Sequence, residues 1–448
     1  MKIDAIILAA GKGTRMNSAL PKVLNNLAGK PLLQHLLDTT KELSNCKHHL
    51  VVGNQQALVK SSVKTSKNSI WVSQSKQLGT GHAVKQTLKN LRPNSTALIL
   101  YGDVPLITSK TMKSLINAAG SKNLALLTFE PPKAKGYGRI LRDSKGKVIG
   151  IIEEKDATSK QKAITEVNSG IMAISSNNLK PLITNLKNKN AAKEYYLTDI
   201  VELATKNQML VKSVKPSSIE EVLGANNLEE LNTLERSYHV MKATELSKNG
   251  VSFNDINRVD FRGDIKIHKG TTIDINCIFE GAVEIAKNSK IGPGVIIRNS
   301  KIGEGVKIEA YTLIENAVLE KNVSAGPFAH IGPEAVLAEN SEIGNFVEIK
   351  RSKIGKGTKA KHLAYIGDGN VDEGVNIGAG TIFVNYDGKN KNKTSVGKGA
   401  FIGSNSSLIA PIRIGHNSMI GAGSVVTKDV PAQKLALARS RQKNIRKK

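Results

Sequence analysis

From about residue 264 to residue 430, an aliphatic side chain returns at every sixth position and is often followed by Gly. Neither an α-helix nor a strand with alternating sides produces a period of six over such a length. A hexapeptide repeat does, because each hexad forms one flat side of a triangular β-solenoid and turns its aliphatic residue inward. The pattern therefore predicts a left-handed parallel β-helix. Its three unbroken runs are Ile267, Ile273, Phe279, Ile285, Ile291 and Ile297; Ile331, Leu337, Ile343 and Ile349; and Val396, Ile402, Leu408, Ile414, Ile420 and Val426.

Glycine directly follows several of these aliphatic residues, as in Ile291-Gly292 and Ile414-Gly415. We interpret it as the residue of a tight corner that a Cβ atom would obstruct. The hexads are interrupted by a polar insertion at Asn385–Thr394, and they stop after Val430-Pro431.

The first half of the chain, residues 3–225, alternates short apolar runs with helical patterns. The runs Ile3–Ala9, His49–Val52 and Ala97–Leu100 predict buried strands, and Leu32–Leu43 predicts an amphipathic helix. Strands that alternate with helices are typical of an α/β domain. We therefore expect a Rossmann-like fold with a mainly parallel sheet.

A continuous helical pattern rich in Glu and Lys lies between the two patterns, over residues 226–249. It predicts a linker helix. The chain should then consist of an α/β domain over residues 1–226, the linker helix over 227–250, the β-helix over 251–432 and a basic tail over 433–448.

The formal net charge of +27 suits either nucleic-acid binding or a Lys-rich enzyme that handles anionic substrates. Basic residues are spread along the whole chain without a nucleic-acid motif, so we expect no specific nucleic-acid binding. No apolar stretch is long enough for membrane insertion, and Met1–Ala5 leads directly into a predicted strand without the features of a signal peptide. Cys46 and Cys277 lie far apart and lack metal-ligand spacing, which suits a reducing compartment. We expect a cytoplasmic protein.

The strongest chemical motif follows the first predicted strand. In Leu8–Met16 a strand opens into a glycine loop whose backbone N–H groups can approach phosphate, and Leu20–Leu24 follows. Arg15 and Lys22 supply cationic partners for a triphosphate. The glycine spacing is neither that of a Walker loop nor that of a dinucleotide fingerprint. The full string resembles the signature of sugar-1-phosphate nucleotidyltransferases.

Further segments agree with this resemblance in the same order along the chain. Asp103 ends a predicted strand, where a carboxylate can hold a divalent ion, although an isolated Asp there could equally be a turn residue. The segments are Gln74–Ala83, Tyr101–Asp103, Gly136–Arg139, Glu153–Asp156, Asn168–Gly170 and Gly224–Asn226. With the β-helix, they make the whole chain resemble the bacterial family of bifunctional N-acetylglucosamine-1-phosphate uridylyltransferases/glucosamine-1-phosphate acetyltransferases, the GlmU family.

The resemblance assigns roles in the first site. It implies that Asp103 and Asn226 hold Mg²⁺ and that Arg15 and Lys22 neutralise the phosphates of UTP. It implies uracil contacts from Gln74, Gly79 and Thr80, sugar contacts from Gly138, Glu153 and Asn168, and further UTP or product contacts from Leu8, Ala9, Gly11 and Tyr101. The attacking sugar phosphate is already ionised near neutral pH, so positioning and charge neutralisation should suffice without a side-chain base.

A second site is indicated in the solenoid, where His362 and Tyr365 are large polar residues among small and aliphatic ones. A His can take a proton from the substrate ammonium as the amine attacks a thioester, so His362 is the candidate base. The alternative is a water-exposed corner residue. The resemblance places Asn385 near the oxyanion, Lys350, Tyr365 and Asn376 on glucosamine-1-phosphate, Ser404, Ala422 and Arg439 on acetyl-coenzyme A, and Ala379 and Tyr386 among the other substrate contacts.

One position departs from the family. The segment Gly326–Pro333 has Gly332 where relatives carry an Arg that grips the acceptor phosphate. Glycine cannot replace a charge-assisted bidentate contact. His330, Lys350 or Arg351 could serve instead, so the acetyltransferase is expected to bind its acceptor less tightly.

Three functions therefore compete. The first is the bifunctional enzyme, which acts on UTP, acetyl-CoA and the two sugar phosphates. The second is a uridylyltransferase whose β-helix only assembles trimers, with an acetyltransferase impaired by Gly332. The third is a non-catalytic regulatory protein of the same architecture. We expect a homotrimer formed through the solenoids, since a prism offers flat faces that can be buried against two neighbours.

Overall fold

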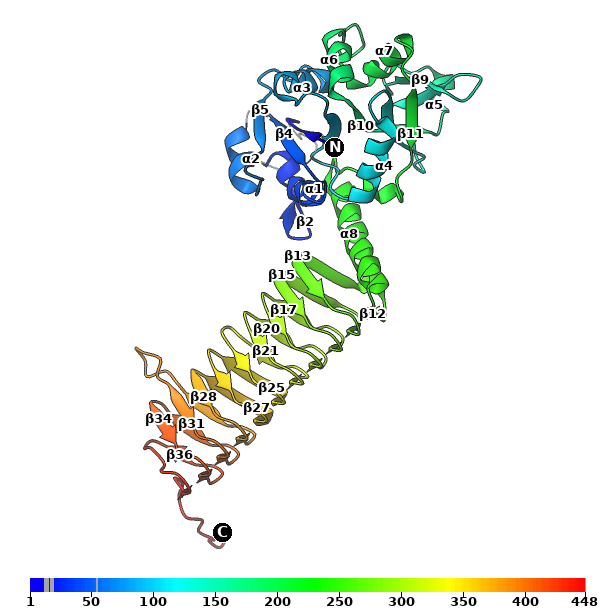
Figure 1. Cartoon of the computed structure of the whole chain (residues 1–448). Coiled ribbons are helices and arrows are strands. Elements are labelled where there is room, and N and C mark those ends of the chain that lie inside the picture. The colour runs from blue at the N-terminus through cyan, green and yellow to red at the C-terminus, as the bar shows by residue number, and fades with distance from the viewer. Residues whose placement is uncertain (12–15, 17–19, 54, 448) are drawn as a thin grey trace. The chain divides into compact units, whose positions relative to one another are not determined.

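The structure is a computed structural model, and it describes residues 1–11, 16, 20–53 and 55–447. The chain divides into two compact units, Met1–Ser237 and Tyr238–Lys448 (Figure 1). Helix α8 (Leu228–Lys248) spans the point of division, where the sequence predicts a linker helix. Within the described part of the chain, no helix is both long and apolar enough to cross a membrane.

The first unit is built on a twisted sheet with the strand order β11-β7-β10-β6-β1-β4-β5. All of these strands are parallel except β10, which runs antiparallel to both of its neighbours. The predicted α/β class with a mainly parallel sheet is confirmed. The strands are β1 (Ile3–Ala9), β4 (Cys46–Val52), β5 (Ile70–Ser73), β6 (Thr96–Tyr101), β7 (Leu124–Phe129), β10 (Val167–Ser175) and β11 (Val211–Val214), with β8 (Arg139–Arg142) and β9 (Val148–Ile152) beside β10.

Helices cover both faces of this sheet, because its strands are apolar on both sides. Ile7 of β1 belongs to one buried cluster, and its neighbour Ile6 belongs to another. Helices α1 (Leu32–Thr40) and α4 (Ser109–Ala119) pack into the first cluster, while α3 (Thr80–Lys85), α6 (Ser176–Thr184) and α7 (Ile200–Lys206) pack into the second. Helices α2 (Gln56–Ser62) and α5 (Ser159–Lys162) are short and mostly exposed.

Helix α4 shows how the sequence sets such boundaries. At its start the Thr108 side chain accepts a hydrogen bond from the backbone N–H of Thr111, which satisfies one of the free donors of the first turn. It ends at Gly120, whose φ of 51° is the left-handed conformation that glycine adopts readily. The predicted helix at residues 32–43 is shorter in the structure and ends at Thr40, after which residues 41–44 form a turn.

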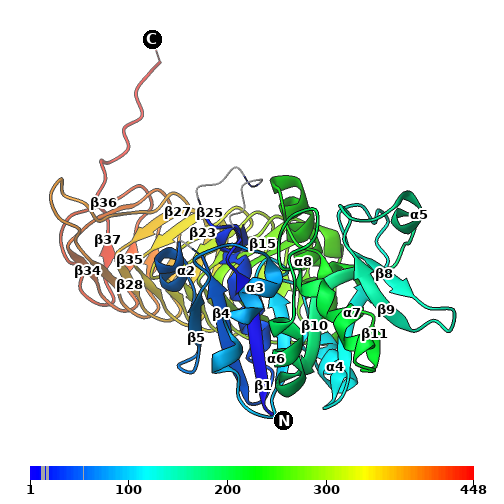
Figure 2. The same cartoon turned by 90° about the horizontal axis from the view of Figure 1, so that it is seen from above.

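The second unit is a solenoid of 26 short strands, from β12 (Ser252–Phe253) to β37 (Leu435–Ala436), and Figure 2 gives a second view of their stacking. Parallel pairing joins each coil to the next. Residue 307 pairs with residue 324 and residue 318 with residue 336, so a coil contains 17 or 18 residues. Every aliphatic residue of the three predicted runs is at most 7% exposed, so the hexad pattern does describe the inward face.

The structure explains differently why glycine is required after the aliphatic residues. Gly292, Gly303 and Gly415 do not have positive φ angles. A Cβ atom on Gly303 would lie 2.6 Å from the Glu320 carbonyl carbon, and one on Gly415 would lie 2.3 Å from the Ala432 amide nitrogen. These glycines are required because the backbone of the next coil passes close by. The left-handed positions of the solenoid are instead occupied by other glycines, such as Gly270, Gly294 and Gly305, and by Asn, including Asn288, Asn299, Asn316, Asn322 and Asn340.

Two candidate active sites

A cavity of about 390 Å³ lies in the first unit at the carboxyl ends of β1, β5 and β6. In parallel sheets this edge is where loops gather and ligands bind. Ten of the residues predicted for the uridylyl site line it: Leu8, Ala9, Gly11, Lys22, Gln74, Gly79, Thr80, Tyr101, Asp103 and Asn226. Arg15 lies outside the described residues.

Lys22 lies at the centre of this cavity's charged groups. Its ammonium donates to Oδ2 of Asp103 and, over 2.7 Å, to Oδ1 of Asn226. Two oxygen ligands from distant segments thus converge on one cation. A carboxylate and an amide oxygen are ligands that Mg²⁺ prefers, so the two residues fit a divalent metal.

Glu230, on the first turn of α8, orients one of these ligands. It accepts hydrogen bonds from the backbone N–H of Asn226 over 2.7 Å and from the Asn226 side-chain amide over 3.0 Å. With its Nδ2 bound to this carboxylate, the amide presents Oδ1 toward Asp103. A group behind a metal ligand commonly fixes its direction in this way.

The segment predicted to contact uracil is anchored by Tyr195. Gly79 has a φ of 103°, and a Cβ atom there would lie 2.7 Å from the Tyr195 carbonyl oxygen. The backbone N–H of Gly81 donates to that same oxygen over 2.8 Å. Gln74 is buried, and its side chain donates to the Gly79 carbonyl over 3.2 Å. The loop therefore has a defined shape, which only glycine permits at residue 79.

The three residues predicted to hold the sugar lie beside one another. The backbone N–H of Asn168 donates to the Gly138 carbonyl over 2.8 Å. A Cβ on Gly138 would approach the Glu153 carboxylate at 3.5 Å. Burial raises the pKa of Glu153, and the charge of Asp156 adds to this, while a 2.8 Å hydrogen bond from Thr198 opposes it. Oδ1 of Asn168 is buried without a partner among the described atoms, so it is free to accept from a ligand.

His362 in the second unit is exposed on strand β27 (Lys359–Gly367). Its Nδ1 lies 3.0 Å from Oδ1 of Asn345, on the preceding coil. An amide oxygen can only accept, so Nδ1 carries the proton and the lone pair is on Nε2. The imidazole is therefore held in the tautomer that a general base requires, with Nε2 as the accepting atom.

Small residues line up next to His362 on the following coils. The pairings Lys359↔Asn376 and Tyr365↔Ile382 place His362 opposite Ala379. The same reasoning places Ser404 opposite Ala379, and Ala422 opposite Ser404. His362, Ala379, Ser404 and Ala422, which we call the small-residue column, thus occupy one line along the solenoid. Because the side chains after His362 are small, they cover little of the backbone along this line.

A polar cluster begins at Tyr365, three residues after His362 on β27. The Asn385 side-chain amide donates to the Asp368 carboxylate and lies 3.4 Å from the Tyr365 hydroxyl. Arg351 binds the same carboxylate with two hydrogen bonds, of 2.7 and 3.0 Å. Among the described residues, Tyr365, Asn385 and Asp368 therefore form one connected group. Arg351 is held within it.

The insertion explains why Asn385 is at this position. Residue 376 pairs with residue 401, whereas residue 359 pairs with residue 376, so the coil after Asn376 is longer than its neighbours. The extra residues form a small hairpin with an antiparallel bridge between Tyr386 and Lys391. Tyr386 is 58% exposed on it. Arg439 is exposed beyond β37.

Gly332 adjoins Lys350, because the pairing Ile331↔Ile349 places the two residues opposite each other on neighbouring coils. Lys350 forms an ion pair with Glu348. His330 contacts both Glu315, at 3.0 Å, and Glu348, at 3.7 Å. Of the three basic residues proposed as substitutes for the missing Arg, Lys350 is thus the direct neighbour of Gly332, and Arg351 is bound to Asp368.

Comparison with known proteins covers both units. Residues 5–167 match the model of the MobA-like NTP transferase domain, and residues 264–299 and 393–428 match that of the bacterial transferase hexapeptide (six repeats). The bifunctional protein GlmU of Idiomarina loihiensis is 48% identical over 99% of this chain and 97% of its own length. Those of Cellvibrio japonicus and Pseudoalteromonas atlantica are 47% and 44% identical, each over 99% of this chain and 98% of the relative.

The chain belongs to the GlmU family. Among solved structures, a UDP-glucose pyrophosphorylase complexed with UDP-glucose aligns with 53% of this chain and 98% of its own at 15% identity, and the TM-score of 0.44 is too low to add to this.

Three residues of this GlmU chain escaped the sequence analysis. Glu230, Tyr195 and Asn345 all support predicted site residues through contacts between distant segments. Asn345 could have been found, since it precedes His362 by 17 positions, which is one coil. Glu230 and Tyr195 leave no local pattern.

Proposed function

We propose that this member of the GlmU family makes UDP-N-acetylglucosamine in two steps. The solenoid transfers an acetyl group from acetyl-CoA to glucosamine-1-phosphate. The α/β domain then transfers uridylyl from UTP to N-acetylglucosamine-1-phosphate and releases pyrophosphate. Near full-length similarity to bifunctional relatives supports both activities rather than a uridylyltransferase with a passive scaffold. Two free cysteines suit the reducing cytoplasm, where we place the reaction.

The convergence of Asp103 and Asn226 on one cation carries the assignment of the uridylyl site. In the reaction, an oxygen of the sugar phosphate bonds to the α-phosphorus of UTP as the bond to pyrophosphate breaks. Mg²⁺, when held by Asp103 and Asn226, supplies positive charge at the reacting phosphates. Lys22, which donates to these same two oxygens, lines the cavity and would add positive charge for the phosphates of UTP. Gly11 lines the same cavity.

Acetyl transfer relies on His362 with its tautomer fixed by Asn345. Nε2 accepts the ammonium proton of glucosamine-1-phosphate as the nitrogen bonds to the thioester carbonyl carbon, and the thiolate of CoA leaves. The Asn385 amide keeps its bond to Asp368, and the N–H that makes only the longer 3.4 Å contact with the Tyr365 hydroxyl would turn to the oxyanion that forms on the carbonyl oxygen. The small-residue column offers the neighbouring backbone to the CoA arm.

Two assays on one preparation test this function. UTP, Mg²⁺ and N-acetylglucosamine-1-phosphate should yield pyrophosphate, and acetyl-CoA with glucosamine-1-phosphate should yield free CoA. Pyrophosphate without CoA would support the scaffold alternative. Neither product would support the non-catalytic alternative.

Lys350 should replace the missing family Arg as the cation nearest the acceptor phosphate. We predict that Lys350→Met raises KM for glucosamine-1-phosphate roughly ten- to a hundred-fold, since one charge-assisted contact contributes about 1.5–3 kcal/mol. KM for acetyl-CoA should be unchanged. Lys353→Met, which removes an exposed lysine from β26 (Lys353–Ile354), the strand after that of Lys350, is the matched control. An unchanged KM for the acceptor in Lys350→Met would remove this assignment.

Substituting Arg at Gly332 is a poor alternative test. The φ of Gly332 is 135°, and a Cβ atom would lie 1.9 Å from the Glu315 carbonyl oxygen. An Arg there would require a different backbone. A loss of activity would then report the distortion and not the contact with phosphate.

An exposed apolar stripe supports assembly through the solenoid. Tyr311, Phe328, Phe346 and Leu363 occupy equivalent corners of successive coils, each with a positive φ and each at least 51% exposed. The three rings stack, with centroids 5.3 and 5.7 Å apart. Bulky side chains in this backbone conformation are strained, and a row of exposed apolar groups is typical of an interface. Leu363 follows His362 directly, so copies packed here would enclose the acetyl site. We infer a homotrimer.

Phe346→Ser should shift the mass in solution from trimer toward monomer. The reason is that it removes the middle of the apolar stripe, while the buried core of the coil is left intact. Sedimentation equilibrium at micromolar concentration measures this. Val318→Ser, which changes an exposed apolar residue on another face, should leave the assembly unaltered. A monomeric unaltered protein would refute the trimer.

A further inference from the structure

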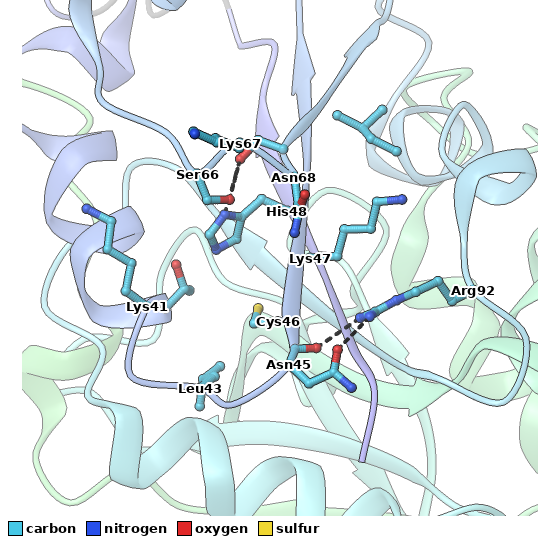
Figure 3. A pocket seen from close by; sticks show the side chains of 13 residues that line it. Lys41, Leu43, Asn45, Cys46, Lys47, His48, Ser66, Lys67, Asn68 and Arg92 are labelled. Carbon is cyan, nitrogen blue, oxygen red and sulfur yellow. Dashed lines mark hydrogen bonds between the residues drawn. The ribbon is translucent and has the colours of Figure 1, made fainter.

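A second cavity of the first unit, of about 590 Å³, lies at the opposite end of the sheet from the uridylyl site (Figure 3). It is lined by residues at the amino ends of β4 and β5, including Asn45–His48 and Ser66–Ile70. The uridylyl cavity is lined by residues that follow the carboxyl ends of β1, β5 and β6. A strand of seven residues, such as β1, separates the two ends by about 20 Å. The two cavities are therefore distinct.

Cations surround this amino-end pocket. Lys41, Lys47 and Lys67 flank it on three sides in Figure 3. No carboxylate is among the described residues that line it. Asp38 pairs with Lys41 at 2.7 Å from outside the pocket, but no described carboxylate pairs with Lys47 or Lys67. Two lysines of the rim are therefore uncompensated.

Arg92, also at the rim, already has hydrogen-bond partners within the protein. It donates to the buried Asp4 carboxylate, to the Asn45 side chain over 2.9 Å and to the Asn45 carbonyl over 3.0 Å. These contacts hold the turn that precedes β4 in place (Figure 3). Arg92 therefore shapes the pocket more than it offers a free charge.

His48 supplies a buried polar atom that lacks a partner. Its side chain lines the pocket and is only 2% exposed. Its Nδ1 lies 3.4 Å from the hydroxyl of Ser69, which in turn lies 3.0 Å from the hydroxyl of Ser66. Its Nε2 is buried and has no hydrogen-bond partner among the described atoms. In Figure 3 the imidazole lies among Ser66, Cys46 and Lys41.

The ring of His48 is neutral near pH 7. Burial, together with the charges of Lys41 and His49, lowers the pKa of His48 to about 4. When the Ser69 hydroxyl donates to Nδ1, the proton of the neutral imidazole is on Nε2, which is then a buried donor without an acceptor. An unsatisfied buried donor is unfavourable, and an acceptor atom of a ligand would satisfy it.

We propose that the amino-end pocket binds a small oxyanion of the phosphate class. Residues with ammonium, hydroxyl and amide groups line it, and the described lining offers no opposing carboxylate. An anion with several acceptor oxygens matches this set, whereas a neutral or cationic ligand does not. The proposal does not depend on either enzymatic activity, because no residue of the pocket belongs to the two candidate active sites.

The chain contains one tryptophan, which provides a reporter. Trp71 lies in β5, directly after the pocket residue Ile70, and the ammonium of Lys60 lies over its ring at 5.5 Å. Inorganic phosphate should change the Trp71 fluorescence with saturation when it replaces chloride at constant ionic strength in the full-length protein. Lys47→Gln and Lys67→Gln should each weaken this binding about tenfold or more. Both side chains are at the surface, so the variants should fold.

Two controls separate the pocket from other sources of binding. Lys145→Gln removes an exposed lysine of a distant turn and should leave the titration unchanged. Lys22→Gln, which alters the uridylyl site, should also leave it unchanged. A response that does not saturate, or one equally weakened by Lys145→Gln, would mean that only the general positive charge of the protein attracts phosphate. A response abolished by Lys22→Gln would place the phosphate in the uridylyl site. Either result overturns the proposal.

Discussion

Asp103→Ala will nearly abolish uridylyl transfer and will leave acetyl transfer intact. The substitution removes the only charged member of the pair that converges on Lys22, and with it the compensation of charge at the reacting phosphates. A loss of about 3–4 kcal/mol of electrostatic stabilisation slows turnover roughly 10²–10³-fold. Pyrophosphate release at saturating UTP and Mg²⁺ measures the effect.

The metal assignment can be tested apart from turnover. Titration with Mn²⁺, followed by the electron paramagnetic resonance of the free ion, should show a site that Asp103→Ala loses. Glu130→Ala removes an exposed carboxylate that does not line the cavity and should change neither Mn²⁺ binding nor rate. Normal uridylyl transfer by Asp103→Ala would show that the metal is held elsewhere.

His362→Ala should have the complementary effect. Acetyl transfer is expected to fall roughly 10²–10⁴-fold, because a positioned general base contributes about that much, while uridylyl transfer continues. Release of CoA from acetyl-CoA in the presence of glucosamine-1-phosphate provides the measurement. His416→Ala, an exposed His of a later coil, is the matched control and should be fully active.

Asn345→Leu gives a graded version of the same test. It leaves His362 in place but removes the acceptor that fixes its tautomer, and a lost hydrogen bond of about 1 kcal/mol corresponds to roughly fivefold in rate. If Asn345→Leu had no effect and His362→Ala retained substantial activity, the exposed-corner interpretation of His362 would be correct.

The solenoid was predictable because its constraint is local and repeated. Each hexad must bury one aliphatic residue, so the period survives in the sequence whatever the rest of the chain does. The reason for the glycines was missed, because Gly303 is required by the backbone of Glu320 on the next coil, and the pattern within a hexad does not show how closely that backbone passes. The insertion after Val384 likewise changes which residues become neighbours.

In the uridylyl site, too, some residues could be predicted from the sequence and others could not. Its glycine loop and strand-end Asp103 were found because the end of a strand can be located from its apolar run. The order of the strands in space, which brings Asn226 to Asp103, follows from crossovers that leave no trace at either residue. Glu230 and Tyr195 were missed for this reason. They orient Asn226 and Gly79 across the fold without having unusual neighbours in sequence.

The small-residue column fixes the distance between the groups that contact a substrate along the solenoid. Neighbouring parallel strands are about 4.8 Å apart, so the three steps from His362 to Ala422 cover about 14 Å. The backbone hydrogen bonds fix this length, and the side chains do not alter it. A long thin substrate bound along the column therefore meets contacts at intervals of one coil. Deleting one coil would shift the contacts at its far end, relative to the base, by one interstrand distance. Such a site can lengthen or shorten only by whole coils, which contain 17 or 18 residues where no insertion interrupts them.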